Sequence, residues 1–221
     1  MAFKQKVIEK FLGKRQNQRV GIIVINNPWG RAHLETYKKA ILATNNVLVR
    51  TIVLPKFDNN EISTELAILK NLNLDAILVS LNYSDSVSFL KKIKELDIRA
   101  KILGNELFGD IVKNGLLDMS TADGVYFTEI SSPQEDFIKK FKENYKKEPG
   151  LNSDTAYDAV HLIAKVIEQY GKDSESIKQG LKKIKYNGAS GEISFDENNF
   201  PSNKKFELIL IKNSQFVPYE K

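Results

Sequence analysis

The chain has 221 residues, a formal net charge of +5 and no cysteine. This length allows one large domain or two small ones, with a sizeable buried core. Without cysteine the chain has no disulfide bonds, no thiolate nucleophile and no thiolate metal site. The two histidines, His33 and His161, have no second ligand at helical spacing, so we expect structural roles for both rather than metal binding or catalysis.

No apolar stretch is long enough to span a bilayer, and the first ten residues lack the apolar segment of a secretory signal. From these residues alone we expect a chain that works in the cytoplasm or a chain whose start is missing. The lysines that give the positive charge are scattered along predicted helices and alternate with glutamates. This pattern is typical of solvated helix faces and does not indicate nucleic-acid binding.

The first half of the chain alternates between helical and strand patterns. Apolar residues at helical spacing predict helices over 7–12, 30–43, 61–69 and 84–96. Apolar, mostly β-branched runs predict strands over 19–25, 47–54, 75–79 and 99–104. Ser84 is the predicted N-cap of the last of these helices. Strands that alternate with helices in this way predict an α/β fold with a parallel sheet covered on both faces.

The pattern changes after residue 127. Ser132-Pro133-Gln134-Glu135 is a capping box that predicts the start of a helix ending near Lys147. Two more helices are predicted over 153–171 and 174–185. Three consecutive helices cannot continue the sheet, and the sequence shows no obvious second sheet for them to cover. Strand patterns return only at 191–195 and 206–211, joined by a turn-rich segment.

Three tight corners each follow a predicted strand. They are Asn26-Asn27-Pro28-Trp29-Gly30, Ser80-Leu81-Asn82-Tyr83-Ser84 and Gly104-Asn105-Glu106. Because the carboxyl ends of parallel strands meet at one edge of a sheet, we expect Trp29, Tyr83 and Glu106 to lie along that edge. Aromatic faces next to an acid suit a small molecule that carries an ammonium group.

These corner residues also have purely structural interpretations. Glu106 would favour the dipole of the helix that follows it, an effect of ~0.3–1 kcal/mol. Trp29 would close the top of the sheet. Asp85 and Asp110, nearby, are expected to be capping or solvated acids rather than ligand-binding groups.

An enzyme would need a nucleophile with a base, a metal cluster or a phosphate-binding loop, and the sequence shows none of these patterns. The segment from Gly104 to Gly109 lacks the glycine spacing of a dinucleotide-binding loop. We therefore expect a protein that is not an enzyme and that uses no cofactor.

Four segments in order resemble one family of proteins. They are Val24-Ile25-Asn26-Asn27-Pro28-Trp29-Gly30-Arg31, Ala156-Tyr157-Asp158-Ala159-Val160, the run 188–196 (GASGEISFD), and the closing run 211–218 (IKNSQFVP). Together they resemble the type I periplasmic binding proteins, the branched-chain-amino-acid-binding family of ABC importers. The resemblance covers essentially the whole chain.

The resemblance implies a fold of two Rossmann-like lobes, joined by three crossings, that close on a ligand. Residues 1–128 plus 204–221 would form the second, ligand-binding lobe, and 129–203 would be the remainder of the first lobe. Hinge motion is expected near 128–132 and 188–203. The opening βα units of the first lobe, and any signal or lipid anchor, are not in this sequence. We therefore expect a truncated form, a gene fragment or half of a split receptor, in which the uncovered helices could mediate self-association.

The resemblance also implies which residues contact the ligand. Trp29 matches an aromatic position that is often tyrosine. Tyr83, or its neighbour Asn82, matches an aromatic position after the next strand. Glu106 matches an acid that pairs with the ligand's ammonium group.

The function implied is that of a periplasmic or cell-surface solute-binding protein, which delivers an amino acid or a related small amide to an ABC permease in the membrane. The alternative is a ligand-sensing module of a receptor or transcription regulator with the same fold. A third and weaker interpretation is a flavodoxin-like enzyme or response regulator, although the first strand lacks the acid pair that phosphorylation needs.

Overall fold

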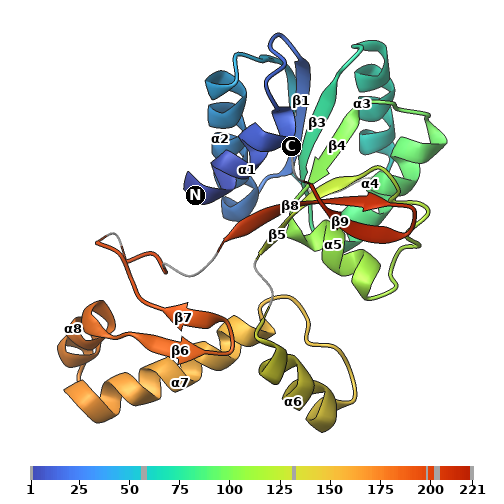
Figure 1. Cartoon of the computed structure of the whole chain (residues 1–221). Coiled ribbons are helices and arrows are strands. Elements are labelled where there is room, and N and C mark those ends of the chain that lie inside the picture. Colours follow the sequence, from blue (N-terminus) through green and yellow to red (C-terminus); the bar gives the residue numbers. More distant parts are fainter. Residues whose placement is uncertain (1, 56–58, 131–132, 198, 202–204, 220–221) are drawn as a thin grey trace. The chain divides into compact units, whose positions relative to one another are not determined.

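The structure is a computed structural model that describes residues 2–55, 59–130, 133–197, 199–201 and 205–219 (Figure 1). The chain divides into two compact units. Unit 1 comprises Met1–Glu129 and Phe206–Lys221, and unit 2 comprises Ile130–Lys205. The predicted assignment of 1–128 with 204–221 and of 129–203 to two lobes of a binding protein stays a prediction.

Unit 1 is an α/β unit built on a seven-stranded sheet. Its helices are α1 (Ala2–Leu12), α2 (Pro28–Ala43), α3 (Asn59–Asn71), α4 (Tyr83–Glu95) and α5 (Glu106–Lys113). Its strands are β1 (Arg19–Ile25), β2 (Val47–Leu54), β3 (Ala76–Ser80), β4 (Lys101–Gly104), β5 (Tyr126–Ile130), β8 (Phe206–Lys212) and β9 (Gln215–Pro218). The strand order is β2-β1-β3-β4-β5-β8-β9. Strand β1 is parallel to β2 and β3, β3 is parallel to β4, β4 is parallel to β5, and β8 is antiparallel to β9. The α/β fold with a mostly parallel sheet is thus confirmed.

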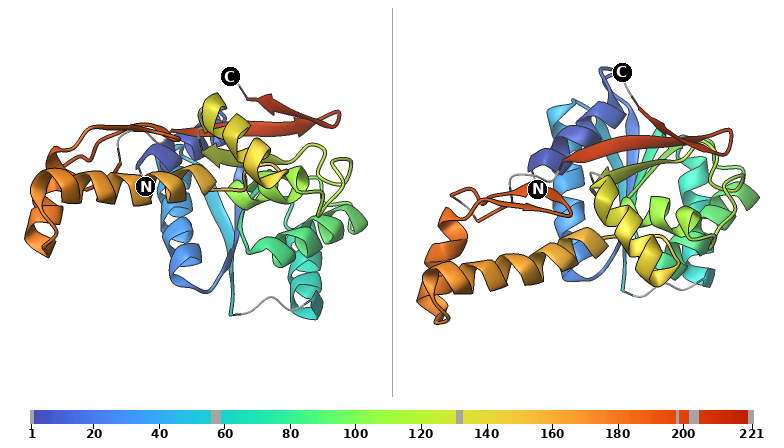
Figure 2. Two further views of the ribbon diagram at one scale, coloured as in Figure 1. Left: turned by 90° about the horizontal axis from the view of Figure 1, so that it is seen from below. Right: turned by 60° about the horizontal axis from the view of Figure 1, so that its bottom comes forward.

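Helices cover both faces of this sheet. Figures 1 and 2 show α1 and α2 on one side, and α3 and α4 on the other. All five residues of β3 are buried, because a strand covered on both faces points every side chain into a core. Each buried Val, Ile or Leu contributes about 1.5–3 kcal/mol relative to an exposed one, so these central strands form the rigid base of the corners.

Unit 2 contains three helices and a small hairpin among its described residues. They are α6 (Glu135–Tyr145), α7 (Ser153–Tyr170), α8 (Ser174–Lys183), β6 (Tyr186–Gly188) and β7 (Gly191–Ile193). Its apolar core consists of Leu162, Val166, Ile184 and Ile193. The antiparallel hairpin of β6 and β7 is a second sheet, which corrects the expectation that these helices have none. The sequence missed β6 because Tyr186-Asn187-Gly188 has no strand pattern.

A buried carboxylate ties this hairpin to α7. Asp158 is 1% exposed and accepts hydrogen bonds from the backbone N–H groups of Ala189 and Ser190, both at 2.7 Å. The Ser190 hydroxyl donates a third bond at 2.6 Å. Three donors on one carboxylate fix the turn between the two strands.

Two predicted N-cap residues were wrong. Helix α6 begins at Glu135 with Gln134 at its N-cap, two residues after the predicted cap, Ser132, which lies outside the described residues. Helix α4 begins at Tyr83, one residue before the predicted cap Ser84. In both cases the predicted N-cap and the observed N-cap differ by two residues, which is the usual uncertainty at helix ends.

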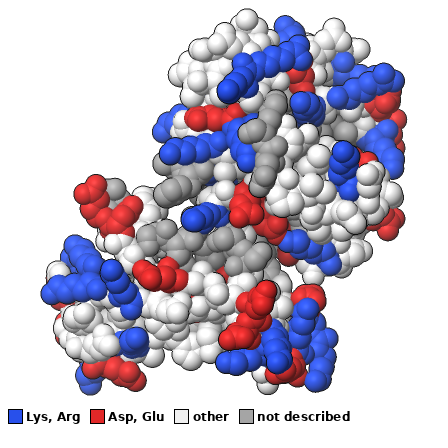
Figure 3. All heavy atoms as spheres, viewed as in Figure 1, with Lys and Arg blue, Asp and Glu red and all other residues white. Residues whose placement is uncertain are grey.

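On the face shown in Figure 3, basic and acidic side chains are interspersed over both units. In the described part of the chain, every helix is too short or too polar to cross a membrane.

Candidate functional site

Three adjacent strands bring the corners to one edge of unit 1. Strands β1, β3 and β4 are neighbours and run parallel, so their carboxyl ends lie side by side. Each corner leads directly into a helix, at Pro28, Tyr83 and Glu106. This is the edge at which open α/β sheets bind ligands.

Asparagine side chains shape two of the corners. The Asn27 side chain accepts a hydrogen bond from the Gly30 N–H at 2.7 Å, and the Asn105 side chain accepts one from the Leu107 N–H at 3.1 Å. Asn105 is fully buried, and its amide nitrogen donates to the Leu81 carbonyl oxygen at 3.1 Å. These bonds cap α2 and α5 and fasten the third corner to the second.

The centre of the site is an ion pair between helices that are far apart in the sequence. The Lys4 ammonium on α1 lies 2.6 Å from Glu106 Oε2, and the two side chains are 4% and 14% exposed. The Thr128 hydroxyl, on β5, donates to the same carboxylate oxygen at 3.4 Å. The ring of Phe206 lies 5.4 Å from the ammonium, within the range of a cation–π contact. Glu106 therefore already has a positively charged partner inside the protein.

His33 connects this ion pair to the second corner. Lys4 Nζ lies 2.9 Å from His33 Nε2. An ammonium group can only donate, so Nε2 accepts and the ring proton is on Nδ1. Nδ1 then donates to the Ser80 hydroxyl oxygen. The indole of Trp29 packs on the imidazole, with ring centroids 4.6 Å apart.

The electrostatics of the cluster follow from its burial. Burial and, to a smaller extent, the Lys4 charge lower the pKa of His33 to about 3 against the opposing effect of Glu106, so the imidazole is neutral at pH 7. Burial also lowers the pKa of Lys4 and outweighs the opposite effect of Glu106. For Glu106, burial alone would raise the pKa, but the charge and hydrogen bond of Lys4 bring it below its usual value. The carboxylate is therefore ionised at neutral pH and balanced by Lys4.

The structure places the sequence-predicted residues in two groups. Trp29 is half-buried and is linked to Glu106 through His33 and Lys4. Tyr83 is 38% exposed, and its hydroxyl donates to the carboxylate of Asp110 on α5.

Asn82 is also exposed, and its amide nitrogen donates to Asp85 at 3.4 Å. Its side chain makes no capping hydrogen bond to α4. Asn82 and Tyr83 thus lie on the middle corner with acidic partners of their own. A role of Trp29, Asn82, Tyr83 or Glu106 in ligand contact stays a prediction.

The sequence did not point to the polar residues that join the corners. Lys4 lies 102 positions from Glu106, and the first helix was expected to begin only at residue 7. His33 was expected to have a structural role, and the sequence predicted no partner for it. Ser80 and Asn105 lie in the corners themselves. A polar residue directly at or after the end of a buried strand was the signal that could have identified them.

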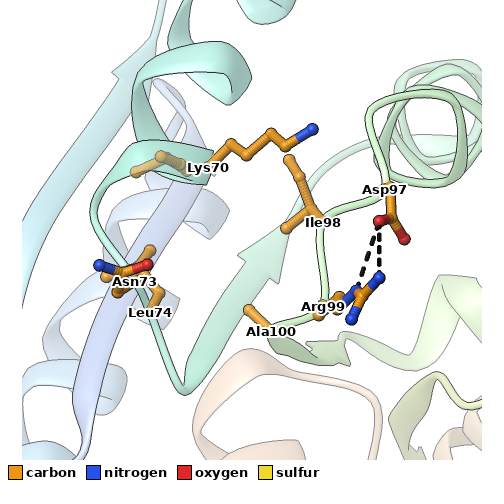
Figure 4. Close-up of a pocket in the computed structure, with 8 residues that line it drawn as sticks. Lys70, Asn73, Leu74, Asp97, Ile98, Arg99 and Ala100 are labelled. Carbon is orange, nitrogen blue, oxygen red and sulfur yellow. Dashed lines mark hydrogen bonds and ion pairs between the residues drawn. The ribbon is translucent and has the colours of Figure 1, made fainter.

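A cavity at the opposite edge of the sheet has a largely solvated lining without aromatic side chains. Its volume is about 300 Å³, and Figure 4 shows it between the end of α3 and the loop before β4. It is lined by Leu69, Lys70, Asn73, Leu74, Asp97, Ile98, Arg99 and Ala100. Its ion pair, Asp97 with Arg99 at 3.1 Å, is largely solvated, with side chains 69% and 86% exposed. An exposed pair of this kind contributes little, and the cavity has no aromatic lining.

Unit 2 has a larger groove of about 720 Å³ between α6, α7 and the hairpin. Stacked aromatic rings form one wall: Phe137, Phe141, Tyr145 and Tyr157. Among the described residues of the whole chain, no cluster of His, Asp or Glu could hold a metal ion.

The sheet order, the parallel corners and the helices that begin at them can be compared with known families. A family profile described as "Periplasmic binding protein" matches residues 5–213. The chain belongs to the periplasmic binding protein family. The predicted resemblance to type I periplasmic binding proteins is thus confirmed.

Solved structures of periplasmic binding proteins share this fold. A solute-binding protein of an ABC transporter from R. palustris, in complex with benzoate, has a TM-score of 0.82 and 17% identity over 98% of this chain and 61% of that one. The leucine binding protein LivK from Thermotoga maritima has a TM-score of 0.78 and 22% identity over 98% and 63%. LivJ from Streptococcus pneumoniae, in complex with isoleucine, has a TM-score of 0.78 and 21% identity over 99% and 65%.

At these identities the likeness is one of fold. The present periplasmic binding protein spans less than two thirds of the length of these solved relatives. No curated protein matches its sequence.

Proposed function

We propose that this chain is the solute-binding component of an ABC importer and binds a small organic solute at the carboxyl edge of the sheet in unit 1. The observation that supports it most is the buried polar cluster of Lys4, His33, Ser80 and Glu106, which carries an aromatic side chain, Trp29, at its border. Buried polar clusters at this edge are the usual basis of ligand specificity in open α/β sheets.

The helix that begins at the middle corner adds a further feature. Helix α4 has no side-chain cap from Asn82, whereas α2 and α5 are capped by Asn27 and Asn105. First-turn N–H groups without a side-chain cap favour a carboxylate oxygen, because the helix dipole is positive at this end. The N-terminus of α4 therefore offers backbone donors to a carboxylate group of a solute, beside the acidic partners Asp85 and Asp110 of this corner.

Two classes of carboxylate solute agree with the family. Solved relatives are described in complex with isoleucine, an amino acid, and with benzoate or 3,4-dihydroxybenzoic acid, which are aromatic acids. The sequence favoured an amino acid or a related small amide, with Glu106 as the partner of its ammonium group. In that case the ligand must take the place of Lys4 at the carboxylate.

The wider role follows from the family. The solute would be handed to an ABC permease in the membrane, and the protein would act in the periplasm or at the cell surface. A direct test of the partnership is co-purification of this chain with a candidate ABC permease, with and without the bound solute.

Calorimetry on the chain with a panel of amino acids, amides and aromatic acids tests the binding site. Trp29→Ala should lower the affinity for the best solute by about tenfold or more, as the loss of one well-packed aromatic contact does. Arg99→Ala, at the opposite edge, is the matched control and should leave the affinity unchanged. The proposal fails if no solute binds, or if Arg99→Ala lowers the affinity and Trp29→Ala does not.

A further inference from the structure

An aromatic ring beside an acid suits a ligand that carries an ammonium group, and the carboxyl edge of unit 1 offers this combination in Trp29 and Glu106. In the structure, however, the acid is already occupied by an ammonium of the chain itself. The Lys4 ammonium lies 2.6 Å from Glu106 Oε2. The same ammonium donates to His33 Nε2 at 2.9 Å, so Lys4 is held on two sides.

Lys4 cannot leave this position easily. Its side chain is 4% exposed, and the helix that carries it is anchored by three apolar side chains, Ile8, Phe11 and Leu12, which are at most 5% exposed. Rotation of Lys4 into solvent would leave His33 Nε2 without its donor. It would also exchange one buried ammonium–carboxylate pair for another, with no net gain in ion pairs.

An incoming ammonium that left Lys4 in place would meet a different penalty. Glu106 would then face two positive charges, which repel each other strongly in a buried site. A neutral group in the same place meets no such repulsion, because Lys4 and Glu106 together carry no net charge.

From this geometry we propose that Lys4 is a specificity-determining residue, whose built-in ammonium makes the site select small carboxylic acids that lack an ammonium group over the corresponding amino acids. This inference rests on the proposed function and narrows it. It differs from the role predicted for Glu106 from the sequence, in which the ligand supplies the ammonium.

The test uses pairs of solutes with one carbon skeleton. L-Leucine is compared with 4-methylpentanoate, and L-phenylalanine with 3-phenylpropanoate, by calorimetry on the full chain. In the wild type, the affinity for the acid without the ammonium group should be at least about tenfold higher than the affinity for its amino acid. This is the ratio expected if the amino acid must disturb the buried Lys4–Glu106 pair. Lys4→Met leaves the Glu106 carboxylate open, so this ratio should reverse in favour of the amino acid.

Two further variants separate charge from fold. Lys4→Arg keeps a cation at Glu106 and should preserve the wild-type order. Lys6→Met removes an exposed lysine two positions away on the same helix and should change neither affinity. If Lys4→Met does not fold, the wild-type comparison decides alone.

The outcomes distinguish the two proposals. A wild type that binds the amino acids more tightly than the matched acids overturns the role of Lys4 and leaves the proposed function intact. A folded Lys4→Met variant with the same ratio of acid affinity to amino-acid affinity as the wild type also overturns the role of Lys4 and leaves the proposed function intact. If no solute of the wider panel binds to either protein at millimolar concentration, the proposed function fails, and the inference fails with it.

Discussion

Acidification gives the most quantitative test of the buried cluster, through His33. Burial and the neighbouring Lys4 charge lower the pKa of His33 from its usual value of 6.5 to about 3. Because the folded pKa lies below the unfolded one, the unfolded chain binds the proton first as the pH falls. The stability associated with neutral His33 is therefore fully present above pH 6.5, and it is lost as the pH falls toward 3.

The size of the effect follows from the difference between the two pKa values. Over the whole range from pH 6.5 to 3 it corresponds to about 5 kcal/mol. Between pH 6.5 and 5 it corresponds to about 2 kcal/mol, which is a large part of the stability of a small domain. The lowered pKa of Glu106 acts in the same direction, but below the usual value of 4.5 for that carboxyl, so the upper part of the range reports on His33.

Urea unfolding followed by tryptophan fluorescence measures this effect in unit 1 alone. The chain has a single tryptophan, and Trp29 packs on the His33 ring. His33→Gln keeps an acceptor for Lys4 but does not titrate, so its free energy of unfolding should be nearly constant between pH 6.5 and 5. His161→Gln, an exposed residue of unit 2, should retain the wild-type slope. A wild type that is equally stable at pH 6.5 and 5, or a His33→Gln variant with the full slope, would show that His33 does not cause the loss of stability in acid.

Two substitutions elsewhere test the structural account. Asp158→Asn removes the carboxylate that accepts three hydrogen bonds and should lower the free energy of unfolding of unit 2 by about 2–4 kcal/mol, measured by amide hydrogen exchange in α7; Asp136→Asn, on the exposed face of α6, should have little effect. Gly30→Ala would place a Cβ atom 2.0 Å from the Ile25 carbonyl oxygen and should lower the stability of unit 1 by about 1–3 kcal/mol. At Gly150 the nearest atom to an added Cβ is Ser153 Oγ at 4.0 Å, which is no clash, so equal losses for Gly30→Ala and Gly150→Ala would contradict the steric explanation.

The sequence predicted the corners because their signals are local. A buried strand followed by asparagine, proline or glycine marks a strand end and a helix start within about five residues. Since β1, β3 and β4 are parallel neighbours, these local signals also placed Trp29 and Glu106 at the same edge. The α/β fold followed from the same alternation of strands and helices.

The sequence could not predict contacts that depend on tertiary packing. Lys4 looks like any lysine of a solvated helix, and only the packing of α1 against α2 and β8 brings it to Glu106. The hairpin of β6 and β7 is similar, since it depends on Asp158, which lies about 30 positions earlier in the chain. In both cases a buried charge, which local pattern does not reveal, fixes the geometry.

The position of the bound solute decides whether the carboxyl edge of the sheet in unit 1 is the binding site. Backbone amide NMR shifts of the isotope-labelled chain can be followed as the tightest-binding solute is added. We expect the largest changes in residues 27–33, 81–86 and 105–110, at the carboxyl ends of β1, β3 and β4. Largest changes at 70–74 and 97–100, around the cavity at the opposite edge, would contradict it.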